Sequence, residues 1–281
     1  TFGLRKEIWK MSSSISQTKN SDLQSSYFLL SLPCRTLLKK EIHRFWAVAG
    51  QTVTAPLISA SLYLFIFGVS LGKKISMLPD VPYLAFIIPG LVIMAVLDNS
   101  YQNTASSIVN AKYHGNIKDV LIAPMNYREF VTAYVLAAMT RGLLVGSLVF
   151  LLSCLFHAPV GLNPLLALFV AILGSVTFAM LGMIAGICSK GWEELSVWSR
   201  FVLLPLTYLG GVFYSIDILP PFWRNLSCLN PLLYIVDVFR FAFLGRSDIN
   251  PMTDICVILV MMAILFAICV RLVTSGFGLR T

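Results

Sequence analysis

Four charged residues lie within otherwise apolar stretches of the chain. Asp98 opens the polar run 98–104, and Arg141 stands alone in a later apolar stretch. Asp237 and Arg240 are three residues apart, a spacing that places both side chains on one face of a helix. A charge in an apolar environment is unfavourable unless it is paired or reaches water. The sequence therefore predicts that Asp98 pairs with Arg141 and that Asp237 pairs with Arg240.

The polar run 98–104 fits two roles. Its side chains could line a path for a polar substrate, or they could form hydrogen bonds between helices that only fix the packing. We favour packing and keep the substrate path as the alternative. The residues assigned to this polar cluster are Asp98, Asn99, Tyr101, Gln102 and Arg141.

The remaining reactive side chains form no catalytic or metal-binding pattern. His43, His114 and His157 are scattered, and the six cysteines contain no Cys-x-x-Cys pair. The chain also lacks GxxxxGK[ST], the glycine-rich loop that holds a nucleotide phosphate. We therefore expect no catalytic residue, no metal and no cofactor bound by this chain. The spacing leaves open a disulfide between Cys228 and Cys256.

The composition excludes an ordinary soluble protein. Of the 281 residues, 57% are hydrophobic and only 12% are charged, and the mean hydropathy is +0.81. A soluble domain carries about 25% charged residues and has no place for so much apolar surface. The sequence therefore predicts an all-α protein that crosses a membrane several times.

Six stretches reach the length of ~20 apolar residues that a spanning helix needs. They are about Val48–Leu71, Tyr83–Ile108, Val131–Phe156, Pro164–Cys188, Ser196–Tyr214 and Thr253–Thr274. Most lysines and arginines lie before the first span and in the connections that fall on the same side. This bias predicts that both termini are cytoplasmic. The net charge of +8 then reflects topology, and we expect no nucleic-acid partner.

The segment before the first span divides into two parts. Residues 1–26 are polar and predict a flexible cytoplasmic tail, and residues 27–46 predict an amphipathic interface helix. Its apolar face would carry Leu38, Ile42 and Phe45, and its basic face would carry Arg35, Lys39 and His43. Such a helix suits the surface of membrane lipids, although a basic flank of the first span would look the same. Residues 47–281 form the transmembrane domain.

An apolar stretch near the C-terminus cannot be one straight helix. Between Leu204 and Gly245 it is interrupted by three pairs of helix-breaking residues. The pattern predicts a re-entrant helical pair over residues 215–245, on the outer side between spans five and six, because a seventh crossing would reverse the C-terminus. The residues assigned to this gate are Gly210, Gly211, Tyr214, Pro220, Pro221, Trp223, Asn230, Asp237 and Arg240.

Several motifs in a fixed order resemble the ABC-2 type transporter permeases of bacteria. They are Glu41–Phe45, Pro89–Gly90, Ala123–Met125, Pro205–Trp223, Leu229–Gly245 and Gly278–Arg280. Within that family the sequence looks similar to the nodulation-factor and polysaccharide exporter permeases. The resemblance implies an export half-transporter of the inner membrane, in which a homodimer works with two cytoplasmic ABC ATPase subunits. ATP and Mg would then be bound by the partner ATPase.

The resemblance also implies that the first inner loop, residues 112–130, docks on the ATPase. In this loop Gly115 and Asn116 break the preceding helix, and Pro124 ends a short helix. A helix end resting on lipid headgroups would fit the same pattern. The residues assigned to ATPase coupling are Gly115, Asn116, Lys118, Asp119, Val120, Leu121 and Pro124.

Two other classes of protein compete with this interpretation. An ion- or proton-coupled carrier would act without an ATPase, but it needs titratable groups in the membrane, and Asp98 and Asp237 are few. A membrane-embedded enzyme would need a set of catalytic polar residues. The pairs Gly68/Gly72, Gly142/Gly146 and Gly182/Gly186 permit close helix packing, which we expect within one subunit.

Overall fold

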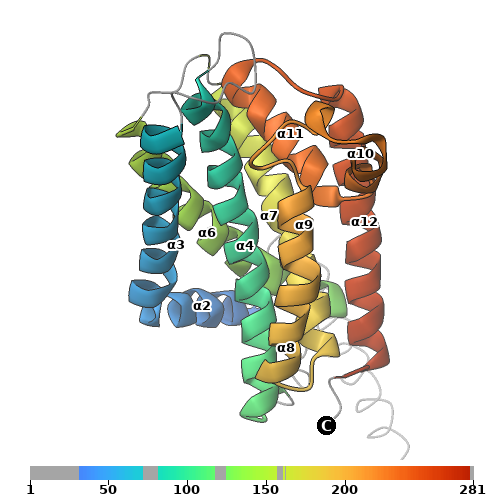
Figure 1. The fold of residues 1–281 in the computed structure, drawn as a ribbon. Coiled ribbons are helices and arrows are strands. Elements are labelled where there is room, and N and C mark those ends of the chain that lie inside the picture. Colours follow the sequence, from blue (N-terminus) through green and yellow to red (C-terminus); the bar gives the residue numbers. More distant parts are fainter. Residues whose placement is uncertain (1–31, 72–81, 118–124, 157–160, 162, 279–281) are drawn as a thin grey trace, which may run out of the picture.

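The computed structural model describes residues 32–71, 82–117, 125–156, 161 and 163–278, and every regular element in this part of the chain is helical. Most helices run along the long dimension of the molecule (Figure 1). These are α3 (Ala49–Tyr63) with its π-helical continuation η2 (Leu64–Leu71), α4 (Tyr83–Tyr113), α6 (Tyr127–Cys154), α7 (Pro164–Cys188), the run α8–η3–α9 (Trp192–Trp198, Ser199–Leu203 and Leu204–Leu209) and α12 (Pro251–Ser275).

Five described helices are long and apolar enough to cross a membrane. They correspond to predicted spans one to four and six, and the second and third extend past the predicted bounds, to Tyr113 and from Tyr127. The additional turns, at the end of α4 and the start of α6, contain polar residues that the hydropathy pattern did not include in the spans. The predicted fifth span is the run α8–η3–α9, which includes Glu193, Glu194 and Arg200 and ends at Leu209 rather than at Tyr214.

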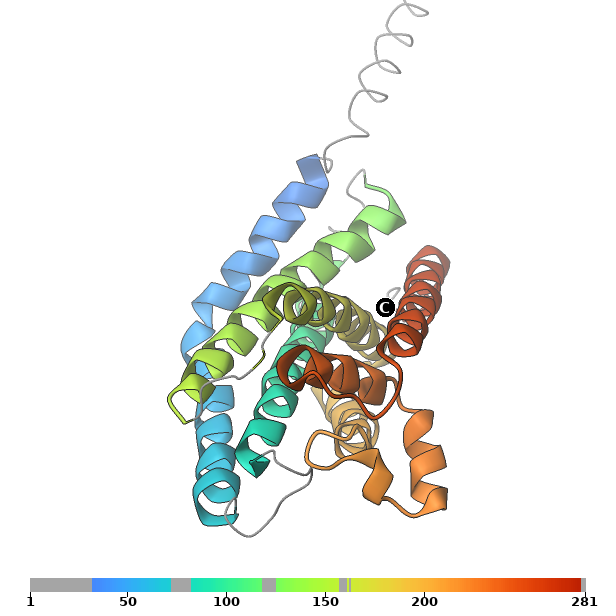
Figure 2. The same ribbon diagram turned by 90° about the horizontal axis from the view of Figure 1, so that it is seen from above.

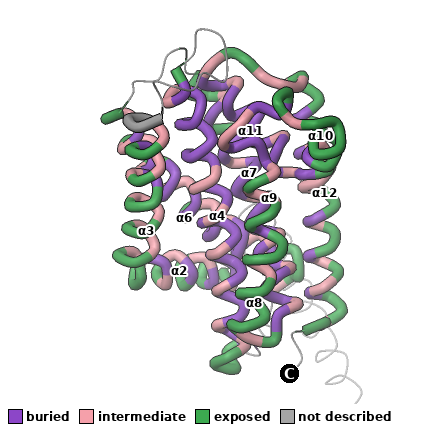
Figure 3. Tube along the Cα trace, in the orientation of Figure 1, coloured by how far each residue is buried: buried purple, intermediate pink, exposed green. Residues whose placement is uncertain are grey.

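Helix α4 is the centre of the molecule. It packs against α6, α7 and α11 (Pro231–Leu244), and most of its side chains are buried. By contrast, α3 buries only Ala60 and α9 buries no residue. Figure 3 shows this difference, with α4, α7 and α11 mostly buried and α3, α9 and α12 mostly exposed or half-buried. The hydrophobic core therefore lies around α4.

Helix α2 (Leu32–Ala47) lies across one end of the bundle, nearly perpendicular to α3 (Figure 1). It runs alongside α6, as Figure 2 shows from above. We call this the inner end, after the predicted cytoplasmic side of the protein, because the C-terminal ends of α4 and α12 lie at the same end of the bundle. The exposed basic residues Arg35, Lys39 and His43 confirm the predicted basic face.

The predicted apolar face of α2 is not the face that packs against the bundle. Leu38 and Ile42 are only half-buried, and Phe45 alone of the three is buried. The stripe that packs against the bundle is instead Cys34, Leu37, Glu41 and Phe45. The charged residue Glu41 thus lies on the face toward the bundle, because Ser107 of α4 donates a hydrogen bond to it. Residues 1–31, which include the predicted tail, lie outside the described residues.

At the opposite, outer end, the chain turns back as predicted. Helices α10 (Pro221–Cys228) and α11 are bent by 90° at residues 229–230, and both stay at this end (Figure 1). A short 3-10 turn, η4 (Ile216–Ile218), precedes them. The re-entrant pair between spans five and six is therefore confirmed. All six cysteines are free, so Cys228 and Cys256 are not bridged.

Glycines let α6 and α7 approach α4 closely. A Cβ atom at Gly142 would lie 2.0 Å from Ser100 Oγ, and one at Gly182 would lie 2.2 Å from the Tyr101 carbonyl oxygen. Gly146 and Gly186 likewise face α4. Two of the predicted glycine pairs therefore pack within the subunit, as expected. The third includes Gly72, which lies outside the described residues.

We expect Gly182→Ala to destabilise the bundle, because the new Cβ would meet a backbone oxygen that cannot rotate away. Overpacking of this kind costs about 1–3 kcal/mol. The midpoint of thermal unfolding in detergent should therefore fall. The control is Gly50→Ala, where a Cβ meets nothing within 4 Å. Equal midpoints for the two variants would show that α4 and α7 separate easily at this contact.

Candidate functional site

The half-buried side of α4 faces α3. Asp98 and Asn99 line a cavity of about 320 Å³ between these helices, together with Pro56, Ser59 and Tyr63. Asp98 is half-buried there. Its carboxylate therefore faces the space between the two helices at membrane depth, where such a group requires protein or water nearby.

Other members of the polar run serve packing. The Ser100 hydroxyl is hydrogen-bonded to that of Ser175 on α7 (2.8 Å), and the Thr104 hydroxyl donates to the Ala179 carbonyl of α7 (2.7 Å). Tyr101 is buried outside the cavity. The run thus divides by face, with Asp98 and Asn99 toward the cavity and Ser100 and Thr104 toward α7.

Arg141 and Asp98 attract each other electrostatically, as predicted, but their side chains form no direct ion pair. Among the salt bridges of the described residues, none joins the two side chains. Arg141 instead donates from Nη2 to Asn99 Oδ1 (3.3 Å), and its guanidinium lies 5.7 Å from the ring centre of Phe45. An amide acceptor and an aromatic face both stabilise a buried guanidinium.

Glu41 and Arg44 attach α2 to α4. The two side chains form an ion pair (3.1 Å), and the Ser107 hydroxyl donates to Glu41 Oε2. Arg44 Nη2 also donates to the carbonyl oxygen (3.1 Å) and the side-chain oxygen (3.3 Å) of Asn103. We call these four residues the α2 latch. The sequence offered one signal for it, the spacing of Glu41 and Arg44, which also occurs in exposed pairs.

The C-terminal end of α4, where the first inner loop begins, is hydrogen-bonded to the end of α7. Lys112 Nζ donates to the carbonyl oxygens of Gly186 (2.9 Å), Ile187 (2.6 Å) and Ser189 (2.9 Å) at the end of α7. A lysine at a helix C-terminus satisfies carbonyls that lack partners within the helix. This bond joins the first inner loop to the second. Reasoning from sequence did not identify Lys112.

The predicted coupling residues are only partly described. Gly115 has φ of 74° and ends the helix, and Asn116 next to it is exposed. Both confirm the predicted break, and Ile117 then turns inward and is buried. The others, Lys118, Asp119, Val120, Leu121 and Pro124, lie outside the described residues.

The two glycines after α9 form a turn against α4. Gly211 has φ of 70°, a conformation that favours glycine. A Cβ at Gly90 would lie 2.6 Å from the Val212 carbonyl oxygen, so the glycine of the Pro89–Gly90 motif makes room for this turn. Tyr83 donates its hydroxyl to the next carbonyl, that of Phe213 (3.2 Å).

Arg240 fastens this turn, and its salt bridge is to Asp248, whereas the predicted partner Asp237 attracts it without direct contact. Arg240 Nη2 donates to the Gly211 carbonyl (2.6 Å), and its guanidinium lies 3.9 Å from the ring centre of Phe86. Its carboxylate partner is Asp248 (3.9 Å). Asp237 instead accepts the backbone N–H groups of residues 248 and 249 (2.9 and 3.0 Å). Arg240 thus holds the glycine turn after α9, and Asp237 holds the loop that follows α11.

Other residues assigned to the gate shape the re-entrant pair. Asn230 accepts from the Leu232 N–H at the start of α11 (3.0 Å) and donates to the Leu206 carbonyl of α9 (2.6 Å). The Tyr214 hydroxyl donates to the Tyr208 carbonyl (2.8 Å). Pro220 and Pro221 start α10, and Trp223 on that helix remains largely exposed.

Aromatic rings gather at the outer end of the cavity between α3 and α4. Tyr63, which lines the cavity, lies 5.5 Å from Phe213 between ring centres, and Phe67 lies 6.2 Å from Phe213. Tyr83 is 6.3 Å from Phe67. Tyr63 therefore links the cavity to a cluster of rings that includes Phe67, Tyr83 and Phe213.

We expect Glu41→Gln to loosen the α2 latch, because the neutral amide loses the ion pair with Arg44. A hydrogen bond to a charged group contributes about 1.5–3 kcal/mol. The measurement is hydrogen exchange of residues 34–46, which should become faster. The control is Lys39→Gln, a charge change on the exposed face of the same helix. Unchanged exchange in Glu41→Gln would mean that apolar contacts alone hold α2.

Comparison with known proteins adds an independent line of evidence. The family model described as ABC-2 type transporter matches residues 33–244. Inner membrane transport permease YadH of Escherichia coli (strain K12) is 41% identical over 250 residues, which cover 88% of this chain and 96% of that protein. Nodulation protein J of Rhizobium meliloti (strain 1021) is 23% identical over 204 residues, covering 72% of this chain and 78% of that protein.

The matched region runs from α2 through α11 and so includes the α2 latch, the cavity and the glycine turn. The family assignment agrees with the all-helical fold and its membrane-spanning helices. The resemblance inferred from motifs is thereby confirmed. This chain belongs to the ABC-2 type transporter family and is a membrane transport permease.

Proposed function

We propose that two copies of this permease form an export route between them, driven by two separate cytoplasmic ABC ATPase subunits. The observation that carries the proposal is the half-buried carboxylate of Asp98 in the cavity between α3 and α4. A single copy leaves this polar group beside α3, one of the least packed helices of the molecule. A second copy would cover it and enclose a polar path.

Two weakly packed helices support this arrangement, α3 at the cavity and α9 elsewhere on the bundle surface. Large apolar side chains are exposed on α3 with η2 (Leu62 and Phe65) and on α9 (Leu204 and Tyr208). A π-helical segment adjoins each helix, η2 after α3 and η3 before α9. Such segments are rare and are found frequently at functional sites. Two loosely packed, irregular helices suit a surface that meets another copy and rearranges during transport.

The walls of the cavity suit an amphiphilic cargo. Asp98 and Asn99 provide polar contacts, whereas Pro56, Tyr63 and Leu91 provide apolar ones. Lipid-linked glycans, lipids and hydrophobic small molecules all combine these properties. The rings of Tyr63, Phe67 and Phe213 would separate the cavity from the outer side until the two copies move.

Energy would enter at the inner end. The loop 112–130 leaves α4 directly beyond Lys112, which is bonded to the end of α7. A push on this loop would therefore reach α4 and α7 together. ATP and Mg would be bound by the ATPase subunits. Closure of the two ATPase subunits on each other would shift the permease from an inward-facing to an outward-facing state.

We expect an ABC ATPase encoded beside this permease to co-purify with it and to hydrolyse ATP faster in the complex. Lys112→Met should reduce that stimulation, because the inner loop loses its bond to α7. Lys190→Met, at an exposed position nearby, is the control. Equal melting points would show that the variant is folded. Transport by the purified permease without an ATPase would contradict the proposal.

A photoreactive amino acid at the proposed dimer face should cross-link two copies. In place of Leu204 on α9 it should give a covalent dimer in native membranes. In place of Val260 on α12, which is similarly exposed, it should cross-link to lipid instead. A dimer formed only from position 260 would place the contact between copies on α12 and rule out the proposed face.

A further inference from the structure

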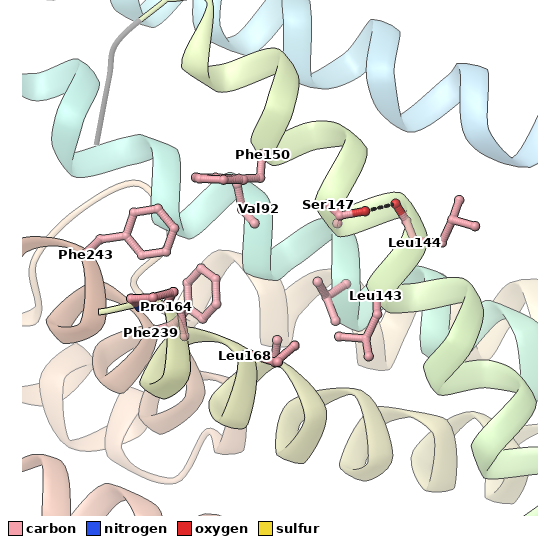
Figure 4. Close-up of a pocket in the computed structure, with 13 residues that line it drawn as sticks. Val92, Leu143, Leu144, Ser147, Phe150, Pro164, Leu168, Phe239 and Phe243 are labelled. Carbon is pink, nitrogen blue, oxygen red and sulfur yellow. Dashed lines mark hydrogen bonds between the residues drawn. The ribbon is translucent and has the colours of Figure 1, made fainter. Parts of the chain in front are cut away.

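A second cavity lies away from Asp98, where α6 and α7 meet α4 and α11. It has a volume of about 470 Å³. Figure 4 shows Leu143, Ser147 and Phe150 of α6 across from Leu168 of α7, with Phe239 and Phe243 of α11 at one end. We call this space the α6–α7 pocket. None of the residues assigned above to a functional site lines it, although Phe239 and Phe243 belong to the motif Leu229–Gly245.

The walls of the α6–α7 pocket offer no polar group to a ligand. Of its lining side chains only that of Ser147 carries a hydroxyl, and this hydroxyl donates to the Leu144 carbonyl of its own helix (2.8 Å), as Figure 4 shows. No lining residue is charged. Three phenylalanines contribute rings, with Phe243 lying 5.8 Å from Phe150 and 5.0 Å from Phe239. An occupant would therefore be held by dispersion and by exclusion of water alone.

The pocket lies at the depth of lipid chains. Val92 and Val96 fall about 14–20 Å along α4 from its outer end at 1.5 Å per residue, and Pro164 begins α7. The hydrocarbon core is about 30 Å thick, so the pocket extends from the outer end of α7 to about the middle of that core. It opens beside Ser147 and Leu168, which are both exposed, and Leu151 and Leu165 near them are exposed as well.

We propose that the α6–α7 pocket binds one acyl chain of a phospholipid from the leaflet at the outer end. The size is suitable, because ligand pockets commonly enclose about 300–1,000 Å³. A helix of a second copy, with a diameter of about 10–12 Å, is too wide to enter between α6 and α7. The polar cavity between α3 and α4 is also lined by different residues, so the two sites are separate.

The bound chain would support the outer gate. Phe239 and Phe243 come from α11, the helix that also carries Asp237 and Arg240. A chain between these rings and α6 would pack α11 against the bundle and fill space that would otherwise remain without contacts. Lipid would thus be part of the structure that holds the gate, and this role does not depend on the proposed dimer or ATPase.

The pocket can be blocked without disturbing the core. Ser147 is exposed at the pocket mouth, so Ser147→Phe should place a ring in the opening. Thr140→Phe is the matched control, since Thr140 is an exposed hydroxyl residue on α6 that does not line the pocket. Each protein is delipidated in detergent and titrated with palmitoyl-oleoyl phosphatidylethanolamine. Native mass spectrometry then counts the bound lipids, and size-exclusion chromatography checks folding.

We expect one tightly held lipid per chain in the natural protein and in Thr140→Phe, and loss of that species in Ser147→Phe. A lysophospholipid should compete for the site, whereas the chain-free headgroup glycerophosphoethanolamine should not. Equal lipid retention by all three proteins would overturn the proposal. So would competition by the headgroup alone, or a change from dimer to monomer in Ser147→Phe without a change in bound lipid.

Discussion

A helix that is surrounded by protein within a membrane must satisfy its polar side chains through its neighbours, because hydrocarbon supplies no hydrogen-bond partner. Helix α4 carries such a set through the middle of this bundle. Ser100 and Thr104 bond to α7, and Asn103 receives Arg44 from α2. Each bond forms only when the neighbouring helix has one position along α4 and one rotation about its own axis. The polar residues therefore determine where α7 and α2 lie around α4. The glycines of α6 and α7 then allow the short distances that these bonds need.

The same constraint explains why cationic side chains in this protein donate hydrogen bonds to backbone carbonyls and do not only pair with carboxylates. Lys112 satisfies the end of α7, and Arg240 satisfies the Gly211 carbonyl in the turn after α9. Both carbonyls lie where a helix has ended and cannot bond within it. A long cation can reach such a group and still contact a second partner, as Arg240 does with the ring of Phe86. The broken helices are therefore stabilised by side chains that come from intact ones.

Sequence patterns predicted the helices better than their contacts. Hydropathy located the spans, and Gly210–Gly211, Pro220–Pro221 and Asn230–Pro231 located the re-entrant pair, because both signals are local. The partner of a charge is not local. Arg141 bonds to Asn99, and Arg240 reaches Asp248 across a loop, which no spacing encodes. Glu41 was missed for the same reason, since its burial depends on Ser107, a residue 66 positions away.

Helix α4 also joins the two ends of the molecule physically. Its inner end bonds to α7 through Lys112, and its outer part contacts the turn fastened by Arg240 through Phe86 and Gly90. The helix is continuous between these points, apart from the one backbone hydrogen bond that Pro89 cannot donate. A displacement of the inner loop would therefore be carried to the outer turn by a single rigid element rather than by a chain of loose contacts. Pro89 lies next to the glycine that receives the turn, so any bend would occur beside the cluster of aromatic rings that Tyr63 links to the cavity. In the proposed transport cycle, a bend at Pro89 would let the short outer part of α4 move with the glycine turn, while the rest of the helix stays rigid and its polar middle keeps its partners.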